Sequence, residues 1–450
     1  MIKFVDMPSP TFQTRDVDGQ NRARGFTLIE MLVSILILVI LMAIIFQIIQ
    51  LTSSAYKQST QSTGTMQQAR VAFERMTRNL SQATLNTYYG YFYATSTSAP
   101  TYYLRLSELQ FVSGWGPVAG AANSTFVTTA GQNAVQVTHA VFFQAPLGAV
   151  SGSDTRTYGN MGNLLNACGY FVTYGPDTSR PNFLNSSGFA SAPPSENRFR
   201  LMEYLQPSEN LNIYTQLPSG VSLAAATSVP PWITNGLPTD LTAASPANVR
   251  PLASNIVALI IMPEEVASAS GTVTVSSNGE ANTIPLNTPA AAANPYYVPP
   301  IPANIPSYAT SVYNAYGYDS CYKALTPKVI TASTSTPVSS SIQFPTGNQL
   351  PPLVKVVMVA IDDASGARLA AKYSSATSTS PPDLGNLITS TAALFQKPAQ
   401  LFTGTTESDL QLFEDILNAS PGNKAGNTVK CNYYVFQSDV IIRGAKWTVN

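Results

Sequence analysis

A predominantly apolar run from Phe26 to Leu51 constrains the fold of this chain more than any other feature of its sequence. The run contains neither Gly nor Pro, and its Leu and Met residues favour a helix. Its polar residues are Thr27, Glu30, Ser34, Gln47 and Gln50. At about 1.5 Å per residue, a helix over this run is long enough to cross a bilayer core of about 30 Å. The run therefore predicts a transmembrane helix over residues 26–51.

The charges on either side of the run predict its orientation. Lys57 is the first basic residue after the run, and four basic residues precede it: Lys3, Arg15, Arg22 and Arg24. Because basic flanking segments stay on the cytoplasmic side, we expect residues 1–25 in the cytoplasm. Residues 52–450 are then expected beyond the inner membrane, in the periplasm or outside the cell.

Two residues of this region have a special position. Gly25 separates the basic segment from the apolar run, and Glu30 is the one charged residue within the run. A carboxylate at the middle of a membrane helix costs about 2.5–3.5 kcal/mol, and less near its end, so Glu30 needs a partner. An ordinary secretory signal has a shorter apolar region that precedes its cleavage site, so this run does not match such a signal. One interpretation is a signal-anchor helix in which Glu30 reaches the membrane interface.

The segment Arg24-Gly25-Phe26-Thr27-Leu28-Ile29-Glu30, followed by the apolar run, resembles the type IV prepilin signal of pilins and type II secretion pseudopilins. The resemblance implies that a prepilin peptidase cuts between Gly25 and Phe26 and that the new amine of Phe26 is N-methylated. It also implies that Glu30 pairs with the amino terminus of a neighbouring pilin-like subunit. Residues 1–25 would then be a leader, and residues 26–51 would remain in the mature chain as its assembly helix.

The overall charge argues against a nucleic-acid partner. Of the 24 basic and 24 acidic residues, residues 1–25 hold four and three, so the remaining chain is close to neutral. Binding to nucleic acid through charge therefore has no support. Charged residues make up 11% of the chain, well below the usual one quarter or so, which suits an exported protein whose polar surface is largely uncharged.

Three cysteines, Cys168, Cys321 and Cys431, fall on the oxidising side of the membrane in this topology. One disulfide can form, the pairing stays open, and one thiol is left over. The cysteine spacings match no zinc motif, so no metal site is predicted from them.

After the membrane run, residues 52–85 predict an amphipathic continuation of the helix. Phe73, Met76, Leu80 and Ala83 recur at helical spacing, which makes one apolar face. Glu74 and Arg78 are four residues apart and can pair on the exposed side. The apolar face can seat a globular domain, and the alternative is a free amphipathic or coiled-coil arm.

Residues 86–450 predict a β-rich globular head, so the fold class is α+β. Strands are expected at segments rich in β-branched and aromatic residues: Tyr103–Val112, Ala134–Phe143, Gly169–Tyr174, Arg198–Leu205, Asn255–Met262, Val354–Ile361 and Asn432–Arg443. The nearly continuous apolar run Leu353–Ile361 indicates a buried central strand. The segments 265–310, 331–340 and 373–382, rich in Ala, Ser, Thr or Pro, predict long loop insertions. One enlarged domain and two domains both fit this pattern.

Two short helices are also expected in the head. Met161–Ala167 forms the first, and Glu407–Asn418 the second. Thr406 with Asp409 three residues later suggests the amino-terminal cap of the second helix.

Beyond the leader, several blocks resemble the Verru_Chthon cassette protein C family. They are residues 69–88 (ARVAFERMTRNLSQATLNTY), 141–148 (VFFQAPLG), 166–172 (NACGYFV), 199–207 (FRLMEYLQP), 255–260 (NIVALI) and 356–362 (VVMVAID). That family is itself similar to the minor pseudopilin J of type II secretion. The resemblance implies a minor, tip-type subunit with a β-rich head, and it names no ligand.

The search for catalytic residues gives little. His139 is the only histidine, and it lies in a predicted strand, which favours a structural role over a Ser-His-Asp system. The acidic pairs Asp362-Asp363 and Glu264-Glu265 can bind calcium through oxygen ligands or simply face solvent. No nucleotide-binding glycine motif is present, so we expect no cofactor and no enzyme activity.

The sequence therefore predicts a minor pseudopilin-like subunit of a type II secretion or type IV pilus-like assembly. Its expected partners are other pilin-like subunits, the prepilin peptidase, the inner membrane and exported cargo. A pilus-tip adhesin is the alternative, because Ser/Thr/Pro loops and groups of tyrosines suit surface binding. A membrane-tethered envelope enzyme is a third hypothesis.

Overall fold

The computed structural model describes residues 27–93, 100–115, 135–151, 158, 161–175, 197–214, 231–234, 248–266, 283–285, 318–320, 349–373, 394–395, 401–402 and 407–445. The chain divides into two compact units, Met1–Ser59 and Thr60–Asn450. A long helix is followed by antiparallel sheets, which confirms the α+β class. The predicted insertion at 331–340 lies outside the described residues, as do most of 265–310 and 373–382.

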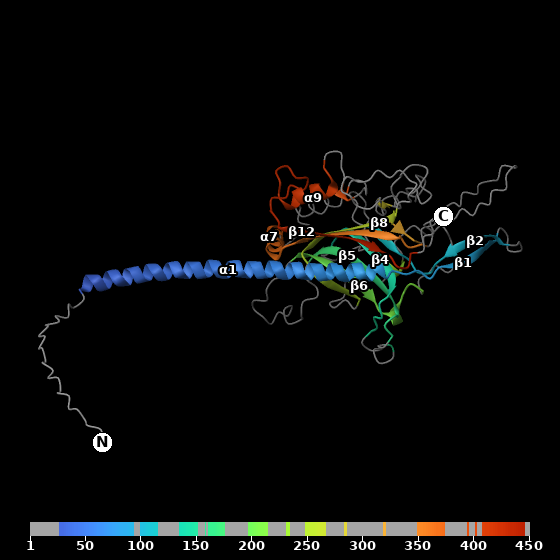
Figure 1. The fold of residues 1–450 in the computed structure, drawn as a ribbon, viewed down its shortest axis with the longest axis horizontal. Coiled ribbons are helices and arrows are strands. Elements are labelled where there is room, and N and C mark those ends of the chain that lie inside the picture. Colours follow the sequence, from blue (N-terminus) through green and yellow to red (C-terminus); the bar gives the residue numbers. More distant parts are fainter. Residues whose placement is uncertain are drawn as a thin grey trace, which may run out of the picture. The chain divides into compact units, whose positions relative to one another are not determined.

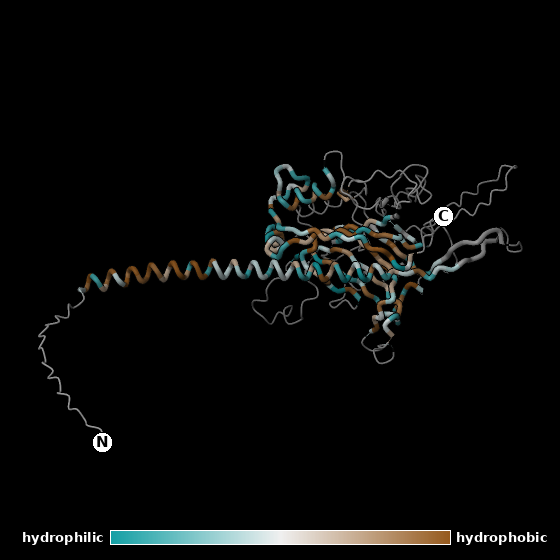
Figure 2. Tube along the Cα trace, viewed as in Figure 1, coloured by the Kyte–Doolittle hydropathy of each residue, from teal (hydrophilic) through white to brown (hydrophobic). Residues whose placement is uncertain are grey.

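Helix α1 runs from Leu28 to Ser81 without interruption. Its first part carries the apolar run, which Figure 2 shows as the brown stretch of the tube. Every residue described from Leu28 to Leu51 is exposed in the isolated chain. Within the described residues, α1 is the one helix whose length and composition would allow it to cross a membrane.

The second unit contains two larger sheets and a separate hairpin (Figure 1). Sheet 1 has six antiparallel strands in the order β10-β3-β4-β5-β6-β7. Their bounds are β3 Val112–Trp115, β4 Val135–Pro146, β5 Leu165–Gly175, β6 Arg198–Gln206, β7 Val249–Ser254 and β10 Tyr318–Asp319. The hairpin pairs β1 (Tyr88–Tyr93) with β2 (Pro100–Leu106).

Sheet 2 has four antiparallel strands in the order β12-β11-β8-β9. Their bounds are β8 Ile256–Val266, β9 Thr283–Pro285, β11 Leu353–Ile361 and β12 Tyr433–Ile441. All nine residues of β11 are buried, which confirms the predicted central strand. Because side chains alternate along a strand, burial of the whole of β11 means that both faces of sheet 2 are covered at this strand.

Asn255 forms the corner at which the chain leaves sheet 1 and enters sheet 2. It has a φ of 62°, in the left-handed region that Asn tolerates better than most residues. Its N–H donates to the carbonyl of Phe199, 2.7 Å away, and its carbonyl accepts from the N–H of Ile361 at 2.9 Å. One residue therefore bonds to a strand of each sheet.

The two sheets are joined again at an irregularity in β4. The register of the pairing between β4 and β5 shifts between Gln136 and Ala140. Within this interval the side chains of Thr138 and His139 contact β8. Thr138 Oγ1 accepts from the N–H of Leu259 at 2.9 Å, and His139 Nδ1 accepts from the N–H of Ile261 at 3.2 Å. These two side chains accept hydrogen bonds from N–H groups of β8 that would otherwise need acceptors on a neighbouring strand.

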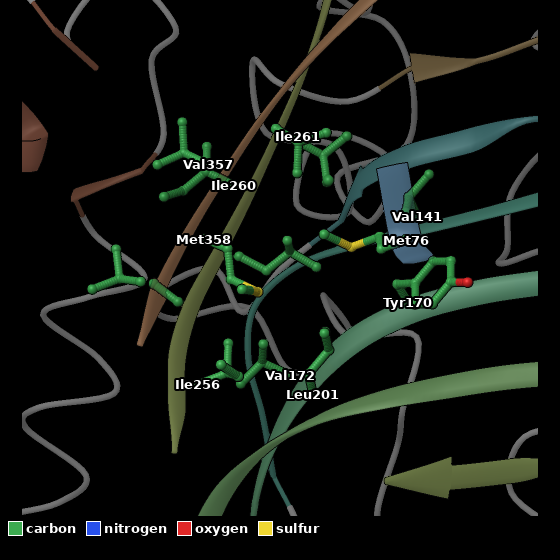
Figure 3. Close-up of a cluster of buried hydrophobic side chains, with 14 of the residues drawn as sticks. Met76, Val141, Tyr170, Val172, Leu201, Ile256, Ile260, Ile261, Val357 and Met358 are labelled. Atoms are coloured by element: carbon green, nitrogen blue, oxygen red, sulfur yellow. The ribbon is translucent and has the colours of Figure 1, made fainter. Parts of the chain in front are cut away.

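The main hydrophobic core lies where α1, sheet 1 and sheet 2 meet. Its members include the helical face Ala69, Ala72, Phe73, Met76, Leu80 and Ala83. Figure 3 shows Met76 beside Val141 and Tyr170 of sheet 1. The ring of Phe73 lies 5.8 Å from that of Phe436 on β12. The predicted apolar face is therefore buried in the head, and residues 69–83 are not a free arm.

The outer face of sheet 1 carries a second, smaller cluster. Phe142 packs there with Phe171, Tyr204 and Trp232, the last from the short helix α4 (Pro231–Thr234). A Cβ on Gly169, which pairs with Phe142 across the strands, would lie 2.2 Å from the Phe142 ring. Glycine at position 169 therefore makes room for the aromatic side chain.

The described part of the head also contains the helices α7 (Asp363–Tyr373) and α9 (Asp409–Leu417), and a short 3-10 turn, η1, at Ser208–Asn210. The ring of Phe413 in α9 lies 5.5 Å from that of Phe395. The cap of α9 is Ser408 and not Thr406, which lies outside the described residues. Ser408 and Gln411 form a reciprocal capping box.

Other local predictions were wrong in detail. The predicted strand Tyr103–Val112 is interrupted, because Ser107 and the N–H groups of Glu108 and Leu109 bond to the side chain of Asn86. The predicted helix at Met161–Ala167 is absent: residues 162–163 form a turn, and β5 begins at Leu165.

Candidate functional site

The amino-terminal end of α1 is closed by a capping box between Thr27 and Glu30. Glu30 Oε2 accepts hydrogen bonds from the N–H and the hydroxyl of Thr27, both at 3.0 Å. In return the N–H of Glu30 donates to Thr27 Oγ1 at 3.3 Å. The Thr-x-x-Glu spacing thus satisfies two main-chain N–H groups that a helix end leaves without a partner.

This box places a carboxylate at the positive end of the helix dipole, which stabilises both the charge and the helix. Glu30 therefore has a local partner within its own chain. Gly25 and Phe26, the predicted cleavage and methylation residues, lie outside the described residues. The capping role of Glu30 could have been predicted from Thr27, Leu28, Ile29 and Glu30, since Thr-x-x-Glu before an apolar run is a start signal for helices.

Within the head, a buried polar cluster joins α1 to sheet 1. Glu203 on β6 has a side chain with 0% exposure, and its Oε1 accepts from Arg75 Nε at 2.8 Å and from the hydroxyl of Tyr170 at 2.9 Å. Its Oε2 accepts from Arg250 Nε at 2.7 Å. Asn79, one turn beyond Arg75 on α1, donates to the Tyr170 hydroxyl at 2.8 Å. We call Arg75, Asn79, Tyr170, Glu203 and Arg250 the Glu203 cluster.

Burial and charge shift the titration of groups in and beside the cluster. Burial lowers the pKa of Arg75, but the Glu203 carboxylate outweighs this effect, so the pKa lies above its ordinary value. Burial raises the pKa of the Tyr170 hydroxyl and raises that of the neighbouring Cys168 thiol to about 12. Cys168 is therefore a neutral thiol at physiological pH, and the charge in this region belongs to Glu203 and the two arginines.

The sequence interpretation missed this cluster. It paired Glu74 with Arg78, whereas Glu74 pairs with Arg70 at 2.9 Å. No local spacing predicts the contact between Arg75, Glu203 and Arg250, because these residues are far apart in the sequence. The one available signal is a charged residue, Glu203, at the centre of the otherwise apolar and aromatic segment Leu201–Leu205 of β6.

The remaining candidate residues have structural surroundings. Cys168 and Cys431 are buried free thiols and are not joined to each other, while Cys321 lies outside the described residues. Asp362 accepts from the N–H of Ser365 at 2.8 Å and so caps α7, and Asp363 is held by Arg198 and Asn255. No group of three metal-binding side chains occurs among the described residues.

His139 is buried, with both ring nitrogens bonded. Nδ1 accepts from the N–H of Ile261, which leaves Nε2 to donate to the carbonyl of Phe395 at 3.1 Å. Burial lowers the pKa of His139 to about 4. The neutral ring therefore joins β4, β8 and the segment at residues 394–395, as the structural interpretation of this residue predicts.

Comparison with known proteins gives one match. Residues 20–46 match the family model of the prokaryotic N-terminal methylation motif. No curated protein and no solved structure matches the chain significantly. The matched segment contains Gly25, Phe26 and the Thr27–Glu30 capping box. The chain therefore carries the amino terminus of a prepilin-like precursor of the type IV pilin and pseudopilin type.

Proposed function

We propose that this protein is a minor pseudopilin-like subunit of a type II secretion or type IV pilus-like assembly. The observation that carries the proposal is the methylation motif at residues 20–46, which coincides with the start of a helix whose apolar residues from Leu28 to Leu51 are all exposed. The blocks that resemble the Verru_Chthon cassette protein C family, and through it pseudopilin J, support the minor-subunit role.

In this proposal the prepilin peptidase cuts between Gly25 and Phe26, and the new amine is methylated. The apolar part of α1 first spans the inner membrane, with residues 1–25 in the cytoplasm and the head on the far side. It then packs against the helices of neighbouring subunits. There a neighbouring amino terminus offers Glu30 a positive partner in place of its own Thr27.

The role proposed for the head is contact with other subunits or cargo, without catalysis. His139 supports this view, because both of its nitrogens are engaged in joining layers of the core. The buried thiol of Cys168, with its pKa raised to about 12 by burial, is a poor nucleophile.

Mass spectrometry of the mature amino terminus tests the proposal directly. We expect an N-methylated Phe26 in protein purified from membranes that contain the prepilin peptidase. An intact Met1, or cleavage after Leu51, would refute the proposed processing.

A matched pair of variants tests the role of Glu30 in assembly. Glu30→Gln keeps a side chain that can close the capping box but removes the charge, whereas Glu30→Ala removes both. We expect both variants to insert and to be processed, and both to be depleted in assembled fibres. Normal incorporation of Glu30→Gln would show that charge pairing at position 30 is dispensable.

A further inference from the structure

The Glu203 cluster presents two arginines to solvent while it buries their shared carboxylate. The Glu203 side chain has 0% exposure, whereas that of Arg75 is 36% exposed and that of Arg250 is 52% exposed. Arg75 comes from α1 and Arg250 from β7, at the edge of sheet 1. The carboxylate thus holds two guanidinium groups from different elements at one place on the surface of the head.

Both guanidinium groups keep unused donors. Each has five N–H groups. Arg75 bonds to Glu203 through Nε, and Arg250 through Nε and Nη2, and neither has a further partner among the described residues. Because Glu203 is at the buried side, the unused N–H groups are those nearer to solvent.

The charges around this site do not balance. Arg75 and Arg250 together carry two positive charges against the single charge of Glu203. Arg78, three residues beyond Arg75 on α1, is exposed and its guanidinium group has no partner among the described residues, whereas Arg70 is paired with Glu74. In a chain with only 11% charged residues, an excess of positive charge on one helix face is a local feature rather than a general one.

We propose that the outer N–H groups of Arg75 and Arg250, here called the arginine pair, bind a carboxylate side chain of a neighbouring pilin-like subunit. A carboxylate carries one negative charge, which matches the excess of one positive charge that Arg75 and Arg250 hold over Glu203. Arginine presents its donors in a rigid planar fork that suits carboxylates, and Glu203 fixes both forks in advance. The inference rests on the proposed function, because it takes the partner to be a subunit that packs beside α1.

Photo-crosslinking of the full-length protein in its own membrane tests the inference. Val71 is 64% exposed and lies one helical turn before Arg75, so p-benzoylphenylalanine at position 71 would report contacts beside the arginine pair. The crosslinked partner is identified by mass spectrometry, and the crosslinked fraction is compared in Arg75→Gln, Arg250→Gln and the double variant. Arg70→Gln is the matched control, because Arg70 lies on the same helix but bonds only to Glu74 among the described residues.

We expect crosslinking to a pilin-like subunit, with the crosslinked fraction reduced about tenfold in each single variant and unchanged in Arg70→Gln. Resistance of each variant to limited proteolysis shows that the head has stayed folded, since Glu203 keeps one arginine and Tyr170 in either single variant.

The outcomes separate this inference from the proposed function. Unchanged crosslinking in the double variant, or crosslinking to lipid alone, overturns the arginine pair as a docking site while an N-methylated Phe26 leaves the proposed function standing. An unprocessed amino terminus overturns the proposed function itself, and with it the identity of the partner.

Discussion

Acidification should weaken the head at one identifiable residue, His139. The neutral ring accepts the N–H of Ile261 at Nδ1 and donates from Nε2 to the carbonyl of Phe395. A proton added at Nδ1 would place two N–H donors opposite each other inside the core. The perturbation that we consider is a decrease in pH from 7 to 4.

The size of the effect follows from the pKa. Burial lowers the pKa of His139 from 6.5 to about 4, so the folded state prefers the neutral ring and the unfolded state takes up the proton first. The contribution to stability is therefore complete above pH 6.5 and is lost as the pH falls towards 4. At about 1.36 kcal/mol per pKa unit, the loss is about 3 kcal/mol.

Urea unfolding of the full-length protein in detergent, followed by tryptophan fluorescence, measures this loss, because Trp232 is buried in the head. His139→Gln keeps a donor and an acceptor but does not titrate. Thr138→Val is the matched control, since Thr138 makes the equivalent bond to the N–H of Leu259 without titrating. Between pH 7 and 4, the wild type and Thr138→Val should each lose about 3 kcal/mol more than His139→Gln. Equal losses in all three proteins would refute the assignment of this acid sensitivity to His139.

Three further predictions concern residues at contacts between elements of the head, and each is measured by urea unfolding at pH 7. Asn255→Ala should destabilise the fold by about 1–2 kcal/mol more than Asn255→Gly, because only the alanine Cβ is strained at positive φ; equal costs would contradict a backbone origin. Gly169→Ala should cost about 1–3 kcal/mol through contact with the Phe142 ring, and a neutral substitution would show that the ring can move away. Glu203→Leu should cost about 1–3 kcal/mol, because the buried hydroxyl of Tyr170 and the inner N–H groups of the partly exposed arginines lose their acceptor, and adding Arg75→Met should recover part of this loss; no recovery would contradict the unpaired Arg75 as a cause.

Elements with a strong periodic pattern could be predicted from the sequence. The face Phe73, Met76, Leu80 and Ala83 repeats at helical spacing, and the structure buries it in the main core. The strand Leu353–Ile361 is apolar apart from Lys355, and it is covered on both faces. Burial acts on one face of the helix and on both faces of the strand, so each element has a regular apolar pattern that can be recognised in its sequence.

Features that depend on contacts between distant segments could not be predicted in this way. The break after β2 arises from the side chain of Asn86, which bonds to the main chain of residues 108 and 109. The turn of Thr138 and His139 towards β8 depends on a shift in the pairing of β4 and β5. Such bonds have no period in the sequence, so a local pattern reports the strand but not its irregularity.

The same distinction applies to the functional residues. Glu30 could be assigned from its sequence neighbours, because its partner Thr27 is three residues away. The arginine pair could not, because Arg75 and Arg250 meet only through Glu203, which is 128 residues beyond Arg75. The prepilin-like motif and its helix can thus be recognised from the sequence, whereas the site proposed for docking is formed only after folding.

Polar residues at the contacts between α1, sheet 1 and sheet 2 explain how an apolar core holds these elements in one arrangement. Apolar contact is non-directional, so α1 and the two sheets could slide against each other at little cost in buried area. Each contact instead contains directional hydrogen bonds. Asn255 makes them at the corner between the sheets, His139 between β4 and β8, and Glu203 between α1 and sheet 1. A buried ion pair adds little net stability, but it penalises every alternative arrangement that leaves a charge without its partner. In the proposed docking of a neighbouring subunit, the bond between Arg75 and Glu203 that holds α1 on the head also positions the arginine pair that the neighbour contacts.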